Sequence, residues 1–137
     1  MTRPAVILDT NIILDVFIFA DVAAKSVRQA LEAGEIDWIA TVPMRDELAR
    51  VLAYPQIVPR LAFYQLSADD VLAGFDRHTR LISPAAKCRL TCRDVDDQKF
   101  IDLAVAEQAV LLSKDRHILS MAKRLRALGV AARTTLL

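Results

Sequence analysis

Residues 6–15 read VILDTNIILD, an apolar run that stops abruptly at a carboxylate and resumes after two short polar residues. A continuous apolar run without alternation, rich in β-branched residues, is typical of a strand in a parallel sheet that helices cover on both faces. Because ligands bind beyond the carboxyl ends of such strands, Asp9 occupies a position suited to chemistry. The alternative is that Asp9, beside Thr10 and Asn11, only caps the next helix.

The length and composition indicate one domain with more apolar residues than its own core requires. A chain of 137 residues buries roughly two thirds of its surface on folding without disulfides or metals to staple it. The hydrophobic fraction is 54% and the mean hydropathy is +0.29. We therefore expect a buried oligomer surface or a partner groove.

The charge and the cysteines narrow the possible classes of protein. With a net charge of +1, no overall field attracts nucleic acid, so any such binding depends on a local patch. No apolar run approaches a membrane span and no signal peptide is recognisable, so we expect a cytoplasmic protein. Cys88 and Cys92 have the spacing of half a zinc site but no second pair, which favours reduced thiols.

Strand and helix patterns alternate along the chain without a linker, a repeat or a low-complexity segment. This alternation predicts one three-layer α/β domain over residues 1–137 with a mainly parallel sheet. The expected strands are residues 6–8, 37–40, 110–113 and, at an edge, 130–135. The expected helices are residues 21–34, 43–53, 67–81 and 118–128, a helix that begins at Asp97, and a short helical connector at 55–66. Residues 12–19 are apolar nearly all round and are either a buried helix or a surface that a partner covers.

Glu47 is an unusual residue in the predicted helix over residues 43–53. The inward stripe of this helix consists of Met44, Leu48 and Val51. Glu47 falls within that stripe, whereas Asp46 and Arg50 form an i,i+4 pair on the outer face. A buried glutamate is costly unless a cation meets it, so Glu47 either has such a partner or reaches from the edge of the stripe to water.

A basic segment directly precedes an acidic one in the middle of the chain. Residues 77–93 contain no acid but five basic side chains, namely Arg77, Arg80, Lys87, Arg89 and Arg93. The sign then changes at once to Asp94, Asp96 and Asp97. The basic run is either a solvated face or a set of phosphate contacts beside a metal site.

Four acids in different elements are placed to converge. Asp9 and Asp115 follow two strands, Glu47 lies on the buried side of one helix, and Asp97 begins another. Carboxylates crowded at one sheet edge raise each other's pKa unless a cation intervenes. Hard oxygen ligands without histidine or thiolate favour Mg²⁺ or Mn²⁺. The chemistry that such a site supports is metal-assisted phosphodiester hydrolysis.

Four segments of the chain together resemble the PIN domain, and most closely the bacterial VapC-like toxin components of toxin-antitoxin systems. They are LDTN at 8–11, ELARVL at 47–52, CRDVDDQKF at 92–100 and LSKD at 112–115. The resemblance covers essentially the whole chain. It implies a three-layer α/β/α fold with about five strands, and a ribonuclease that depends on Mg²⁺ or Mn²⁺.

The resemblance also implies roles for individual residues. The catalytic, metal-binding quartet falls on Asp9, Glu47, Asp97 and Asp115, with Asp96 as the alternative third acid. Asn11 and Ser113 would orient the carboxylates or a water at the metal, Asp94 would support them, and Asp102 would lie on the surface. The implied partners are RNA, a second copy of the chain and a cognate antitoxin. The last two would contact surfaces formed by Val16, Phe17, Phe19 and residues 57–64.

Three functions follow, of which the first is favoured. It is a metal-dependent endoribonuclease, acting as the toxin of a type II toxin-antitoxin system. The second is a PIN-like module that binds RNA or protein without cutting. The third is a receiver-type signalling domain, in which Lys114 would imitate the late lysine, but Asp9-Thr10 supplies no acidic pair.

Overall fold

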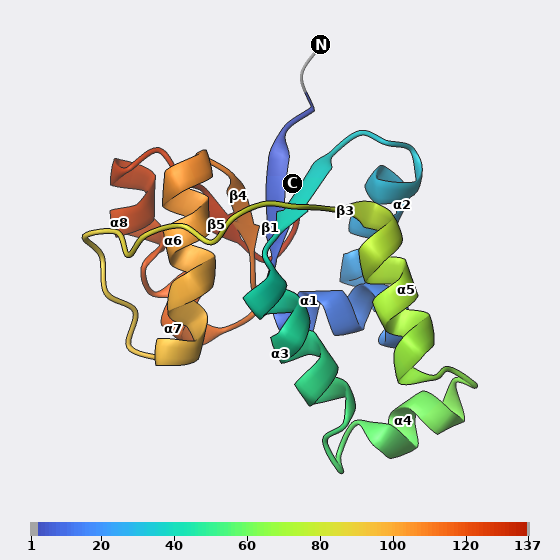
Figure 1. The fold of residues 1–137 in the computed structure, drawn as a ribbon. Coiled ribbons are helices and arrows are strands. Elements are labelled where there is room, and N and C mark those ends of the chain that lie inside the picture. The colour runs from blue at the N-terminus through green and yellow to red at the C-terminus, as the bar shows by residue number, and fades with distance from the viewer. Residues whose placement is uncertain (1–2, 137) are drawn as a thin grey trace.

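The computed structural model describes residues 3–136 and contains one sheet of five parallel strands. The strand order is β3-β2-β1-β4-β5, with β1 in the centre (Figure 1). The strands are β1 (Ala5–Leu8), β2 (Asp37–Ala40), β3 (Thr79–Leu81), β4 (Val110–Leu112) and β5 (Ala132–Arg133). The prediction of a three-layer α/β/α fold with a mainly parallel sheet of about five strands is confirmed.

Helices cover both faces of this sheet, with α6 and α8 on one side of the strands and α2 and α5 on the other (Figure 1). The helices are α1 (Thr10–Leu14), α2 (Lys25–Glu32), α3 (Val42–Leu52), α4 (Val58–Phe63), α5 (Ala68–His78), α6 (Gln98–Glu107), α7 (Arg116–Leu119) and α8 (Ala122–Ala127). A π-helical segment, Asp15–Phe19, follows α1, and 3₁₀ turns occupy Val22–Ala24 and Val95–Asp97. Within residues 3–136, no helix is long and apolar enough to cross a membrane.

The core forms where the two helical layers meet the sheet. Ile7, Ile39 and Leu111, one from each of three neighbouring strands, have no exposed surface. Trp38 of β2 packs edge-on against Phe75 of α5, with ring centroids 5.2 Å apart. Such complete burial explains why these strands read as continuous apolar runs rather than as alternating patterns.

Two of the differences from the predicted element boundaries change the structure of a segment. The helix expected to reach residue 81 ends at His78, because Thr79–Leu81 is extended and pairs with β2 as the edge strand β3. The helix expected over 118–128 is interrupted at Ser120 and Met121, where Met121 leaves helical geometry and caps α8 while its side chain stays buried. The first change arises from pairing with β2, which overrides the local helical periodicity.

Two side chains of α6 hold the long loop between β3 and α6 in place through hydrogen bonds. One carboxylate oxygen of Asp102 accepts hydrogen bonds from Cys88 N at 3.0 Å and from Gln98 Nε2 at 2.7 Å. The Gln98 amide also accepts from Cys92 N at 2.6 Å and donates to Leu90 O at 2.9 Å. Asp102 is therefore buried, which corrects its expected surface position: the loop folds back over this face of α6. Cys88 and Cys92 carry free thiols.

Replacing Asp102 with alanine should destabilise the protein by about 2 kcal/mol, because it leaves the Cys88 amide and one Gln98 donor without their buried acceptor. Urea denaturation measures the loss. Glu107→Ala, which removes an exposed acid from the end of the same helix, is the matched control and should change stability by less than about 0.5 kcal/mol. Equal stability of the two variants would contradict the bracing role of Asp102.

Candidate functional site

An acidic cleft of about 410 Å³ lies beyond the carboxyl ends of β1 and β4. Its lining includes six acids, namely Asp9, Glu47, Asp94, Asp96, Asp97 and Asp115. Asn11 lines it as well, so the four predicted quartet acids and three of the four predicted supporting residues face one cleft. The segments that supply them end or begin at the same sheet edge, as parallel strands with covering helices require.

Asp9 both caps a helix and lines the cleft, so its position is not explained by capping alone. One oxygen accepts from Ile12 N at 3.0 Å at the start of α1, and the other accepts from the Ser113 hydroxyl. The Ser113 oxygen in turn accepts from Asp115 N at 2.9 Å. Burial raises the pKa of Asp9 to about 6, although the Ser113 hydrogen bond opposes this shift.

Asp94, Asp97 and Asp115 form the tightest group of acids in the cleft. Each offers a carboxylate oxygen, and these oxygens lie within 4.8 Å of one another. Burial, followed by repulsion from Asp115 and Asp94, raises the pKa of Asp97 to about 7. Asp96 is exposed and stands outside this group, with its N–H donating to Asp94 at 2.9 Å. The geometry thus brings together Asp97, the favoured third acid, and Asp94.

The donor set of this group fits a hard divalent cation. Among residues 3–136, Asp97 Oδ2 is the buried side-chain oxygen that has no hydrogen-bond partner. An unpartnered buried carboxylate oxygen is costly, and a cation bound beside Asp94 and Asp115 would satisfy it. Three oxygen ligands without nitrogen or sulfur donors match the preference of Mg²⁺ or Mn²⁺.

Glu47 has the cationic partner that its buried position requires. Lys99 Nζ lies 2.6 Å from Glu47 Oε1, and the Thr10 hydroxyl donates to Oε2. Both side chains of the ion pair are more than two thirds buried. The sequence indicated the need for a cation but not its identity, because Lys99 lies 52 residues away in the chain. The position of Lys99 directly after Asp97 and Gln98 was the sequence feature that could have identified it as the partner of Glu47.

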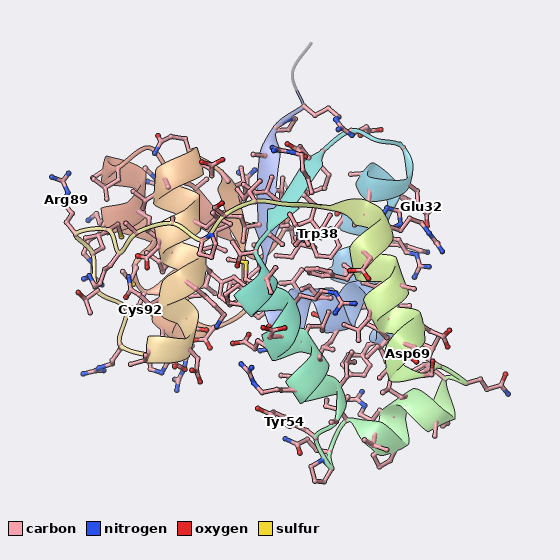
Figure 2. All side chains as sticks on the ribbon, viewed as in Figure 1. Glu32, Trp38, Tyr54, Asp69, Arg89 and Cys92 are labelled. Carbon is pink, nitrogen blue, oxygen red and sulfur yellow. The ribbon has the colours of Figure 1, made fainter. Side chains whose placement is uncertain are left out.

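The predicted phosphate contacts are scattered over other parts of the molecule. Arg80 pairs with Asp37 at 2.7 Å. Asp37 lies opposite Ala5 at the amino end of the central strands, whereas Asp9 follows their carboxyl end. Lys87 Nζ donates to backbone carbonyls of its own loop. Arg77 and Arg93 line two separate hollows, and Arg89 extends from the loop over α6 and α8 (Figure 2). Among the described residues, Arg50 is the arginine that lines the acidic cleft.

This fold and this site define a class of three-layer α/β proteins with a cluster of carboxylates at the carboxyl edge of a parallel sheet. The family model of the PIN domain matches residues 5–117. The chain belongs to the PIN domain family. None of the curated proteins matches it.

A solved structure supports the same fold. In the crystal structure of VapBC2 from Rickettsia felis bound to a DNA fragment from their promoter, one chain superposes on this one with a TM-score of 0.64. The match covers 93% of this chain and 98% of that chain at 17% sequence identity. At that identity, the likeness concerns the fold.

The strand order excludes the receiver-type alternative. Receiver domains have the order 2-1-3-4-5, whereas this sheet has the order 3-2-1-4-5. Lys114, which would have imitated the receiver lysine, forms an ion pair with Asp15 at 2.6 Å. The fold is therefore not that of a receiver domain.

The metal-free protein should lose stability as the pH rises. Asp9 and Asp97 have pKa values of about 6 and about 7 when folded, against an ordinary value near 4 when unfolded. The folded state thus binds more protons between pH 4 and pH 7, so this contribution is complete below pH 4 and is lost as the pH rises through 7. Melting temperatures in EDTA from pH 5 to pH 8 measure the slope.

Mg²⁺ should flatten that slope by binding the ionised carboxylates, and Asp97→Asn should flatten it without metal. Asp69→Asn, an exposed acid at the start of α5, is the matched control and should retain the wild-type slope. A slope that is unchanged by Asp97→Asn would contradict the assignment of this pKa.

Lys99→Met keeps the aliphatic stem of the side chain but removes the charge that pairs with Glu47. We expect the free energy of unfolding in EDTA to fall by about 1–2 kcal/mol, because a largely buried carboxylate loses its partner. We also expect Mg²⁺ to raise the melting temperature more than in the wild type, since the cleft becomes more negative. Lys99→Arg should behave as wild type, and an unchanged response of Lys99→Met to Mg²⁺ would refute this account.

Proposed function

We propose that this PIN domain protein is an endoribonuclease that depends on Mg²⁺ or Mn²⁺ and hydrolyses RNA phosphodiester bonds. The observation that carries the proposal is the group formed by Asp94, Asp97 and Asp115, with a buried Asp97 oxygen that lacks a partner. Asp9 and Glu47 line the same cleft. Membership of the PIN family supports the same chemistry.

The proposal assigns roles to the residues of the cleft. Asp9, Glu47, Asp97 and Asp115 hold the cation, with Asp94 as an additional carboxylate. A bound ion supplies charge neutralisation at a phosphodiester oxygen and lowers the pKa of a water molecule. Ser113 fixes Asp9 and the Asp115 backbone relative to each other. Asn11, exposed at the start of α1, supplies a neutral polar contact to the substrate or to water.

A binding module that does not cut RNA is the second candidate. It is favoured by the ion pair between Glu47 and Lys99, because a protein cation already satisfies one acid of the quartet. The crowding around Asp97 weighs against it. A fold that only binds RNA gains nothing from acids that repel one another and raise the pKa of Asp97.

We further propose that the protein is the toxin of a type II toxin-antitoxin system, acting in the cytoplasm as a homodimer and inhibited by an antitoxin. The structural similarity to a VapBC2 complex supports this proposal. Around α4, Val58 and Phe63 are 49% and 80% exposed, and this apolar surface suits a protein partner. Val16, expected in such a surface, is 1% exposed and belongs to the core. Phe17 and Phe19 are partly buried.

The test is cleavage of a mixed single-stranded RNA pool by the purified protein in Mg²⁺, in Mn²⁺ and in EDTA. We expect cleavage with either metal, none in EDTA, and a loss of about 100-fold or more in Asp97→Asn. Asp69→Asn, purified in parallel, should cut at the wild-type rate. Equal cutting by wild type and Asp97→Asn would indicate a contaminating nuclease and contradict the assignment, whereas RNA binding without metal-dependent cutting would favour the second candidate.

A further inference from the structure

Arg50 and Tyr54 extend the acidic cleft along α3. Arg50 follows Glu47 by three residues in α3, so the two side chains are neighbours on the helix surface, and Arg50 lines the cleft rather than forming the expected outer-face pair with Asp46. Tyr54 lies just beyond the end of α3, where its N–H bonds to Val51 O at 3.0 Å and continues the turn (Figure 2). Arg50 and Tyr54 both line the cleft that holds the acids.

The Arg50 guanidinium is free to bind an anion. It is exposed, and within residues 3–136 it has no ion pair, although Asp46 lies one helical turn before it. By contrast, Arg28, Arg45 and Arg80 each pair with a carboxylate. A cleft lined by six acids repels a phosphate, so a strand that enters it needs a cation at the rim. A planar guanidinium with five N–H donors is well suited to a phosphodiester.

Tyr54 offers an aromatic face beside that cation. The side chain is 43% exposed. Tyr64 packs against Phe19 in a tilted arrangement and edge-on against Phe63, whereas in the described structure Tyr54 packs against no other aromatic ring. Exposed aromatic rings bind nucleobases by stacking, and stacking on a side chain requires an unpaired base.

We propose that Arg50 and Tyr54 form a subsite for single-stranded nucleic acid, in which Arg50 binds a backbone phosphate and Tyr54 stacks on a neighbouring base. This inference rests on the proposed nuclease function and deepens it, since it assigns the substrate contacts to α3 rather than to the basic run at 77–93. The subsite uses phosphate and base but no 2′-hydroxyl, so its contribution is the same for RNA and DNA strands. It selects unpaired strands over duplexes.

Binding of a fluorescein-labelled 12-nucleotide RNA, followed by anisotropy in Mg²⁺, tests the subsite. All binding measurements use the Asp97→Asn background, so that the strand is not cut, whereas KM is measured with the Asp97 protein. Arg50→Ala should weaken binding about tenfold and reduce the slope of log K against log salt by about 0.7, the value for one phosphate contact on a single strand. Arg126→Ala, which removes an exposed arginine from α8, is the matched control and should keep both values.

Tyr54→Ala should weaken binding about tenfold or more, while Tyr54→Phe retains it because the ring is preserved. A 2-aminopurine base in the strand should lose fluorescence when the strand binds the protein that retains Tyr54. It should keep its fluorescence when the strand binds Tyr54→Ala. The affinity for a duplex of the same sequence should not respond to Tyr54→Ala. An equal loss on the duplex, or a loss with RNA but not with DNA of the same sequence, would overturn the stacking assignment.

These outcomes separate the subsite from the nuclease itself. Loss of binding in both alanine variants, with no cutting by the wild type, would support the subsite and refute the proposed reaction. Metal-dependent cutting by the wild type, with unchanged KM, affinity and salt slope in Arg50→Ala and Tyr54→Ala, would support the reaction and overturn the subsite.

Discussion

The register between β1 and β4 determines the site. Leu8 pairs with Leu112, so the chain leaves both strands at the same level, and Asp9 N still bonds to Leu112 O at 3.0 Å. Ser113 consequently lies beside Asp9 and donates to it, while accepting from the Asp115 backbone. A slip of one residue would turn the side chains of β4 to the other face of the sheet. The packing of the central strands therefore fixes the positions of two of the four quartet acids.

The same packing makes the site costly to fold. Burial and mutual repulsion hold protons on Asp9 and Asp97 at pH values where free carboxylates are ionised. The protein offsets part of this cost with Lys99, which neutralises Glu47, and with Ser113. It leaves Asp97 Oδ2 unsatisfied. Strain of this kind is characteristic of functional sites, where the missing partner is a ligand rather than a side chain.

The sequence predicts those features that depend on local pattern and on the rule that parallel strands end at one edge. These features include β1, β2, β4, the sheet type and the meeting of Asp9, Glu47, Asp97 and Asp115 at one cleft. It misses β3, whose three residues continue a helical pattern and become a strand only through pairing with β2. Asp102 is misplaced for a related reason, since helical periodicity does not reveal which loop folds over a polar face. The phosphate contacts assigned to residues 77–93 also assume that residues close in the chain gather in space, and those side chains separate in the fold.

Under the proposed function, the charge of the protein argues for a local rather than a global mode of nucleic-acid binding. A net charge of +1 supplies no long-range attraction, and the cleft itself is acidic. A strand is therefore repelled from the metal-free cleft and is attracted only when a cation neutralises the carboxylates. Strand binding and metal binding are then linked, and each must strengthen the other by the same factor. In the proposed nuclease, such linkage would confine productive contact with nucleic acid to the metal-loaded protein and would leave the choice among strands to the few side chains at the rim.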